Sequence, residues 1–337
     1  MTKGLKSFKL YLSDERGVEQ MAKVILLVAP ITRTQREELT QVAPKDDFFT
    51  LSELPDDRWQ DIEVIYGWSQ TIDVEKLKKE GQTLRWIQAE SAGFNHLPLS
   101  FLQENNIMLS NASGVHGNQM SETILGMIFS HTRGLKESIH NQRDKLWETP
   151  KGLTDLANKK VMIVGTGAIG QRLAEILTVF NVDVLGVNRR GGQAPFFKTI
   201  IQQDKIQQSL GEMDIVVSLL PSTAATKHLF NSELFEQMKE GSLFINAGRG
   251  DTVNTPDLIT ALEQGPLAFA GLDVFEHEPL PTDSPLWEMD NVMITPHTSG
   301  VSDQYYERLF PIFKDNLVSF KKDHLLVRNQ VSIEQGY

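Results

Sequence analysis

Short apolar runs alternate with amphipathic stretches along almost the whole chain. The runs are apolar at successive positions, which is typical of strands that helices cover on both faces. The runs of strand length are residues 24–29, 63–67, 84–89 and 107–111, and then residues 160–164, 182–187, 214–220, 242–246, 268–273 and 291–295. The pattern predicts an α/β protein with two doubly wound parallel sheets, one from each set of runs.

Two long amphipathic segments set the order of the domains. Residues 118–147 separate the two sets of strands and are predicted to form the longest helix, with a stripe made of Met120, Ile124, Met127, Ile128 and Leu135. Residues 302–322 form a last helix, which Pro311 is expected to kink. Its apolar side, made of Leu309, Ile312, Phe313, Leu317 and Phe320, is expected to return to the first set of strands. The second domain is therefore predicted to be inserted into the first.

Composition and charge exclude several classes of function. A chain of 337 residues, 40% hydrophobic and 23% charged, is ordinary for a globular protein with two cores. The net charge of −11 argues against nucleic acid or an anionic membrane as a partner. The chain has no cysteine, which excludes disulfides and thiolate metal sites and is consistent with a cytoplasmic location. No spacing of Asp, Glu and His suggests a metal site either.

Neither a membrane span nor a secretory signal is expected. No apolar run approaches the roughly 20 residues that cross a bilayer, and the first residues lack the continuous apolar core of a signal peptide. Residues 1–20 are either an extension outside the fold or a lead-in to the first strand, which follows Met21.

The segment VMIVGTGAIG, residues 161–170, has the pattern of a dinucleotide-binding turn between a buried strand and a helix. Gly165 would permit the tight turn, Gly167 the approach of a pyrophosphate, and Gly170 the close packing of helix on strand. The N–H groups at the start of the helix would face the phosphates. The predicted cofactor contacts are Gly165, Thr166, Gly167, Ala168, Ile169 and Gly170. A glycine-rich structural turn is the alternative interpretation.

The end of the following strand indicates which dinucleotide binds. An NAD site usually has an Asp or Glu there for the ribose hydroxyls, but this chain has Asn188, Arg189 and Arg190. No carboxylate would repel a 2′-phosphate, and two guanidinium groups could bind one. The sequence therefore favours NADP(H), with NAD(H) still possible. The alternative is that the arginines are only solvated.

Three further residues each follow a predicted strand. Arg249 follows strand 242–246, Glu278 follows strand 268–273, and His297 follows strand 291–295. Open α/β sheets bind their ligands at the carboxyl ends of the strands. An anion-binding guanidinium, a carboxylate and a titratable imidazole are thus predicted to meet at one edge of the sheet.

Several ordered motifs give the chain a family resemblance. SAGFNHL, GTGAIG, LLPSTAATKHLF, LFINAGRGDTVN, GLDVFEHEPLP and TPHTSG occur in this order. With them, the chain resembles the D-isomer-specific 2-hydroxyacid dehydrogenase family from about residue 23 to near its end. The resemblance implies a Rossmann NAD(P)-binding domain, residues 118–296, inserted into a flavodoxin-like substrate domain, residues 1–117 and 297–337.

The resemblance also implies a reaction, which is hydride transfer between nicotinamide C4 and C2 of a small 2-oxo or 2-hydroxy acid. In the reducing direction, His297 would donate a proton to the carbonyl oxygen, Glu278 would orient His297, and Arg249 would bind the substrate carboxylate. The motif register assigns this role to Glu278 and not to its neighbour Glu276. His277 is expected to be an exposed loop residue.

Further contacts follow only from the resemblance. The backbone of Ala92, Gly93 and Phe94 would bind the substrate carboxylate. The residues that would line the cofactor are Leu220, Pro221, Thr226, Ala247, Asp273 and Gly300. Trp147 would either enter the substrate pocket of a neighbouring subunit, in a homodimer formed through residues 118–147, or pack on its own helix.

The substrate remains open at this stage. Phe94 and Asn95 replace the commoner small residue and aspartate, and His116 and Gln119 precede or begin the long helix where many members are plainer. We expect a substrate similar to glyoxylate or hydroxypyruvate, or another small 2-oxo acid. The alternatives are a 3-phosphoglycerate dehydrogenase and a non-catalytic NAD(H)-sensing scaffold. Formate dehydrogenases lack a glutamate at the position of Glu278, so this residue argues against them.

Overall fold

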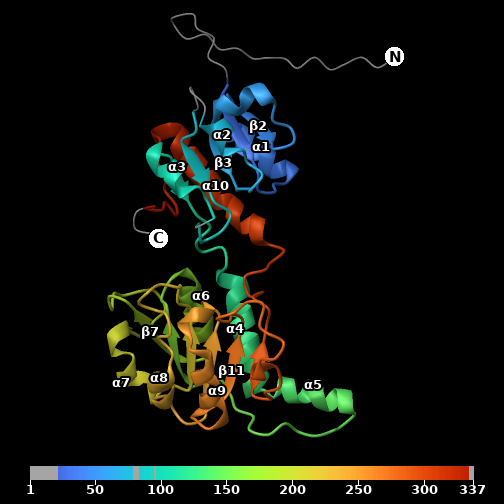
Figure 1. Cartoon of the computed structure of the whole chain (residues 1–337), viewed down its shortest axis with the longest axis vertical. Helices are drawn as coiled ribbons and strands as arrows, with labels where there is room; N and C mark the ends of the chain where they lie inside the picture. Colours follow the sequence, from blue (N-terminus) through green and yellow to red (C-terminus); the bar gives the residue numbers. More distant parts are fainter. Residues whose placement is uncertain (1–21, 79–82, 95, 334–337) are drawn as a thin grey trace, which may run out of the picture. The chain divides into compact units, whose positions relative to one another are not determined.

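The chain folds into two compact units, each with its own sheet and core (Figure 1). The computed structural model describes residues 22–78, 83–94 and 96–333, so the expectations for residues 1–20 and for Asn95 lie outside the described residues. Unit 1 contains the described residues up to Val115 and those from Asp303 onward. Unit 2 contains His116–Ser302, and therefore includes His297.

Unit 1 has a five-stranded parallel sheet in the order β2-β1-β3-β4-β5, which is the flavodoxin-like order. The strands are β1 Val24–Leu27, β2 Asp47–Thr50, β3 Ile62–Tyr66, β4 Trp86–Gln88 and β5 Met108–Ser110. Core residues of α1 and α10 cover one face, and core residues of α2 and α3 cover the other. The helices are α1 Arg33–Val42, α2 Val74–Leu77, α3 Leu99–Glu104 and α10 Tyr305–Asp323, with a 3-10 helix at Asp56–Asp61.

Unit 2 has a seven-stranded parallel sheet in the order β12-β11-β10-β9-β6-β7-β8, and the chain reverses direction across the sheet between β6 and β9. This reversal is the switch point at which such sheets bind ligands. The strands are β6 Lys160–Val164, β7 Asp183–Asn188, β8 Thr199–Gln202, β9 Ile215–Ser218, β10 Ser242–Asn246, β11 Leu267–Leu272 and β12 Val292–Ile294.

Helices cover both faces of the unit 2 sheet. Buried residues of α4 and α6 pack on one face, and buried residues of α7, α8 and α9 pack on the other. The helices are α4 Gly117–Thr132, α5 Leu135–Asp144, α6 Ala168–Val179, α7 Gln207–Leu210, α8 Ser232–Glu236 and α9 Thr255–Glu263, with 3-10 helices at Gln203–Lys205, Gly250–Thr252 and Pro285–Trp287. No helix among the described residues is long and apolar enough to cross a membrane.

The predicted α/β class with two parallel sheets is confirmed, and each predicted strand is present. The strands β2 and β8 were not predicted. Both lie at the edge of a sheet and both are largely half-exposed. The other two edge strands, β5 and β12, were predicted. In β2 and β8 only two successive residues are apolar, so they lack the run that predicted the other strands.

The single long helix predicted over residues 118–147 is wrong. The helix α4 ends at Thr132 and α5 begins at Leu135, because Gly134 adopts a left-handed conformation with φ +61°. A Cβ at Gly134 would lie 2.4 Å from Pro150 Cβ, so the break is fixed by packing. Leu135, which was expected in the buried stripe, is 48% exposed, and Trp147 lies beyond the end of α5.

Candidate active site

The glycine loop joins β6 to α6 in unit 2. Gly165 has φ +115°, and a Cβ at Gly170 would lie 2.1 Å from Gly165 O, so the fold itself requires both glycines. Gly167 is different. It is the N-cap of α6, and a Cβ there would meet nothing within 4 Å. The absence of a side chain at Gly167 therefore keeps space open in front of the helix and is not needed for packing.

The start of α6 supplies hydrogen-bond donors to this space. The first N–H groups of a helix have no acceptor within the helix, and the first N–H of α6 that bonds within it is that of Gln171, which donates to Gly167 O at 2.9 Å. The earlier N–H groups, of Ala168, Ile169 and Gly170, lie at the positive end of the helix dipole. An open position beside such donors fits the pyrophosphate of a dinucleotide.

The turn after β7 lies beside the glycine loop. The side-chain amide of Asn188 donates to Thr166 Oγ1 at 2.9 Å, so a hydrogen bond joins the two loops directly. Arg189 and Arg190 follow in the turn, and both are exposed. The structure thus brings the three residues predicted to select the cofactor next to the predicted pyrophosphate site.

The loop after β9 contains the predicted cofactor-lining residues Leu220, Pro221 and Thr226. Leu220 is buried and Pro221 is exposed. The Thr226 hydroxyl donates to Pro221 O at 2.7 Å and accepts from Thr223 N at 2.9 Å, so this side chain shapes the turn. Ala247, after the neighbouring strand β10, is also buried.

Arg249 lies in the next loop, between β10 and a 3-10 helix. A Cβ at Gly250 would lie 1.9 Å from Phe275 C, so the segment packs against the loop after β11 only because that position is glycine. The Arg249 carbonyl accepts hydrogen bonds from Asn246 Nδ2 at 3.2 Å and from Thr252 Oγ1 at 2.7 Å. These contacts fix the main chain, and the arginine itself is exposed.

Glu278 and His297 form a pair. Glu278 Oε2 lies 2.7 Å from His297 Nδ1, and Glu278 Oε1 accepts from Phe275 N at 3.0 Å. Because a carboxylate only accepts hydrogen bonds, Nδ1 carries the proton in this pair and Nε2 is the nitrogen available for chemistry. The structure therefore brings together two of the three predicted catalytic side chains, from the loops after adjacent strands β11 and β12.

Glu276 has a different environment. Its Oε1 lies 2.6 Å from His228 Nε2, and its Oε2 accepts from Thr255 N at the start of α9 at 2.8 Å. Burial alone would raise the pKa of Glu276, but hydrogen bonds from Thr255 and His228 outweigh it and lower the pKa. Glu276 thus joins α9 to neighbouring loops, while His277 is exposed.

The backbone of His297 is held by Asp273. His297 has φ +53°, a left-handed conformation that costs a non-glycine residue about 1–3 kcal/mol. Its N–H donates to Asp273 O at 2.9 Å, and the buried Asp273 carboxylate accepts from Thr298 N at 2.9 Å and from Thr295 Oγ1 at 2.6 Å. The carboxylate also accepts from the N–H and hydroxyl of Ser299. This support for the His297 loop was not predicted from the sequence, and the predicted contact of Asp273 with the cofactor stays a prediction.

His116 lies against the same loop. A Cβ at Gly300 would lie 3.1 Å from His116 Cδ2, and Gln119 Nε2 donates to Gly300 O at 3.2 Å. Burial and, next, the positive charge of Arg249 lower the pKa of His116. Two residues in which the chain departs from the family pattern therefore lie beside the predicted cofactor residue Gly300 within unit 2.

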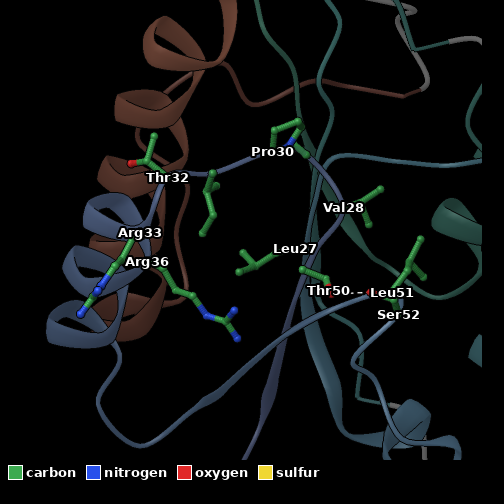
Figure 2. A pocket seen from close by; sticks show the side chains of 11 residues that line it. Leu27, Val28, Pro30, Thr32, Arg33, Arg36, Thr50, Leu51 and Ser52 are labelled. Atoms are coloured by element: carbon green, nitrogen blue, oxygen red, sulfur yellow. Dashed lines mark hydrogen bonds between the residues drawn. The ribbon is translucent and has the colours of Figure 1, made fainter.

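The remaining predicted residues lie elsewhere. In unit 1, Ala92 and Gly93 are exposed after β4, whereas the Phe94 side chain is buried in the core. In unit 2, the Trp147 side chain is fully exposed at 103%, so it does not pack on its own helix. A groove of about 600 Å³ also lies at the ends of β1 and β2 in unit 1 (Figure 2). Its lining, which includes Arg36 and Thr50, has none of the described predicted site residues.

A family match accounts for the positions of these residues. Residues 125–299, more than half of the chain, match the family described as "D-isomer specific 2-hydroxyacid dehydrogenase, NAD binding domain". The chain belongs to the D-isomer specific 2-hydroxyacid dehydrogenases. This dehydrogenase is therefore an NAD(P)-dependent oxidoreductase that acts on CH–OH donors.

Several known proteins are similar to this dehydrogenase over most of its length. Glyoxylate/hydroxypyruvate reductase B of Escherichia fergusonii is 32% identical over 262 residues, which are 76% of this chain and 81% of that protein. The structure of phosphoglycerate dehydrogenase from Lactobacillus plantarum is 37% identical, with a TM-score of 0.57 and coverage of 92% of this chain and 100% of that chain. An NADPH-dependent glyoxylate/hydroxypyruvate reductase from Sinorhizobium meliloti, solved with NADP and sulfate, is 25% identical, with a TM-score of 0.73 and coverage of 94% and 100%.

Proposed function

We propose that this dehydrogenase reduces small 2-oxo acids to D-2-hydroxy acids and prefers NADPH. The observation on which the reaction rests is the 2.7 Å contact between Glu278 Oε2 and His297 Nδ1, next to the loop that carries Arg249. The names of the reductases from Escherichia fergusonii and Sinorhizobium meliloti support glyoxylate and hydroxypyruvate as the first substrates to test.

Each catalytic residue has a separate task in this proposal. Glu278 holds the Nδ1–H of His297, so that the protonated imidazole gives up its proton from Nε2 to the substrate carbonyl oxygen. Arg249 binds the substrate carboxylate with its planar set of donors. The bound nicotinamide would supply the hydride to C2. The backbone of Ala92–Phe94 remains a predicted contact for the carboxylate.

The preference for NADPH rests on Arg189 and Arg190 after β7. Their exposed guanidinium groups follow a strand that ends without a carboxylate, so they could neutralise a 2′-phosphate. The test is the ratio of kcat/KM for NADPH to kcat/KM for NADH. We expect a ratio above one in the wild type and a lower ratio in Arg189→Asp. A wild-type ratio below one would contradict the preference.

A substrate panel tests the reaction. NADPH oxidation is followed with glyoxylate, hydroxypyruvate, pyruvate, branched 2-oxo acids and 3-phosphohydroxypyruvate. We expect turnover of the small acids. Turnover only with 3-phosphohydroxypyruvate would favour the alternative that the 37% identical phosphoglycerate dehydrogenase suggests. Tight cofactor binding without turnover of any acid would favour a non-catalytic scaffold.

The dehydrogenase is also proposed to form a homodimer through α5 and the segment after it. Large apolar side chains are exposed there: Leu135, Ile139, Leu146 and Trp147 are 48%, 65%, 49% and 103% exposed. If a second copy of the chain covered these side chains, their apolar surface would be removed from water, which favours association. Light scattering is expected to give a dimer for the wild type and a monomer for Ile139→Glu. A wild-type monomer would contradict this assignment and the proposed role of Trp147 in a neighbouring subunit.

A further inference from the structure

We propose that Asn188 does not contact the cofactor but fixes the turn that carries Arg189 and Arg190, and thereby creates the site for a 2′-phosphate. The inference deepens the proposed NADPH preference and rests on it. It changes the role that the sequence suggests for Asn188, from a ligand contact to a positioning residue.

The hydrogen bonds of Asn188 are the first reason. Its Nδ2 donates to Thr166 Oγ1 at 2.9 Å and to Gly192 O at 2.9 Å, and its Oδ1 accepts from Arg190 N at 3.1 Å and Gly191 N at 2.7 Å. A carboxamide has two N–H donors and two acceptor lone pairs. All four are used within the protein, so a ribose hydroxyl could bind to Asn188 only if one of these bonds broke.

These bonds hold both ends of the turn that carries Arg189 and Arg190. The N–H groups of Arg190 and Gly191 and the carbonyl of Gly192 all bond to one side chain, which itself extends from the end of the buried strand β7. The main chain of Arg189 and Arg190 is therefore fixed before any ligand binds. A fixed main chain lowers the entropy that two long arginine side chains lose when they bind a phosphate.

Thr166 connects this turn to the glycine loop. A Cβ at Gly186 would lie 2.7 Å from Thr166 Cγ2, so the Thr166 methyl group packs directly on the backbone of β7. The Thr166 hydroxyl accepts from Asn188, and its hydrogen is then directed away from Asn188. Through its bond to Thr166, the Asn188 side chain thus holds the turn predicted to bind the 2′-phosphate in a fixed position beside the loop predicted to bind the pyrophosphate.

An aspartate could not do the same. A carboxylate has no donor, so it would lose the bond to the Gly192 carbonyl and place a negative charge against that oxygen. Toward Thr166 it could only accept the hydroxyl hydrogen, so the direction of that bond would reverse. The residue type found at the end of β7 is therefore the one that keeps the turn closed without adding a charge that repels phosphate.

The test uses two ligands that differ only in the 2′-phosphate, 2′,5′-ADP and 5′-AMP, and measures their binding by calorimetry without turnover. In Asn188→Ala we expect the affinity for 2′,5′-ADP to fall by roughly 10-fold or more, as for the loss of a charge-assisted contact. The affinity for 5′-AMP should change much less. Thr166→Val removes one of the four bonds and should give a smaller loss of the same kind. The control is Asn181→Ala, because the Asn181 side chain donates to Asn158 Oδ1 near the opposite end of β7, away from the turn.

A double-mutant cycle separates positioning from contact. In the background Arg189→Gln with Arg190→Gln, the further change Asn188→Ala should cause no additional loss of 2′,5′-ADP affinity, because no arginine is left to position. An equal and additive loss in both backgrounds would overturn the inference, as would equal losses for 2′,5′-ADP and 5′-AMP in Asn188→Ala. Failure of the substrate panel would contradict the proposed reaction but would not alter these binding results.

Discussion

The glycine loop predicts opposite outcomes for two substitutions three residues apart. At Gly170, an alanine Cβ would lie 2.1 Å from Gly165 O, far inside the 3.4 Å at which ordinary contact begins. The oxygen is backbone, so α6 would have to move away from β6 by more than 1 Å. Overpacking of this kind costs at least about 1–3 kcal/mol, and each kcal/mol lowers the Tm of a unit of this size by roughly 2–4 °C. Gly170→Ala should therefore unfold about 2–12 °C below the wild type.

At Gly167, an alanine Cβ would meet nothing within 4 Å, and φ −71° with ψ −169° is a conformation that alanine adopts readily. Alanine is a slightly poorer N-cap than glycine, which lowers the free energy of unfolding, but it makes the unfolded chain less flexible, which raises it. The two effects offset each other to within about 0.5 kcal/mol. Gly167→Ala should thus keep the wild-type Tm. It should lose cofactor affinity, because the methyl group projects into the space in front of α6. A cost of about 1–3 kcal/mol there corresponds to a roughly 5- to 150-fold higher Kd.

Thermal unfolding without ligand and fluorescence titration with NADPH measure the two effects separately. The reasoning would be refuted if Gly167→Ala bound NADPH like the wild type, because the open position would then not face the cofactor. It would also be refuted if Gly170→Ala kept the wild-type Tm, because the 2.1 Å contact would then have been relieved at no cost.

Three further predictions concern the titratable side chains. His297→Gln and Glu278→Gln should each lower kcat by roughly 10²–10⁴-fold while the Kd for NADPH stays unchanged, and a near-normal kcat in either would end the assignment. Glu276→Gln should instead keep kcat and lose stability. Folding lowers the pKa of Glu276, so the ionised carboxylate stabilises the wild type at pH values above its ordinary pKa of about 4.3. This stability is lost as the pH falls through the folded pKa. The difference in Tm between the wild type and Glu276→Gln should therefore become smaller on acidification. The pKa of His116 is lowered by burial and by Arg249, so the wild type should lose stability as the pH falls below about 6.5; His116→Gln should show a smaller loss between pH 7 and 5.5.

The fold could be predicted from the sequence where burial determines residue type. The central strands of both sheets are apolar on both faces, so their runs show directly in the sequence. The edge strands β2 and β8 are half-exposed and have only two successive apolar residues each, so they left no such signal. The break between α4 and α5 was missed for another reason. Gly134 stands within an apolar stripe of helical spacing, and only its contact with Pro150 shows that the chain must turn there.

The candidate site could be predicted because chain order and sheet order agree at one end of unit 2. The strands β10, β11 and β12 are neighbours in the sheet and consecutive in the chain, so residues that follow each of them must lie at the same edge. Arg249, Glu278 and His297 were predicted to lie at one edge because each follows a predicted strand, and their catalytic roles were predicted from the family resemblance. The motif register did predict Glu278 and not Glu276 as the partner of His297. The other hydrogen-bond partners were not predictable, because each depends on contacts between loops. Examples are the contact of Glu276 with His228 and the four bonds of Asn188.

The site divides its tasks between residues that hold loops and residues that are exposed on those loops. Asn188 and Asp273 stand in motifs that suggest a cofactor contact, yet the structure uses their polar atoms to hold loops. Arg190 and His297 are exposed on those loops, and their backbones are fixed by these neighbours. A buried polar group is stable only when its hydrogen bonds are satisfied. A residue that holds a loop must therefore direct its polar atoms inward, whereas a residue that binds a ligand must keep some directed outward. Substitution of Asn188 or Asp273 should consequently change ligand binding through the loop that each one holds.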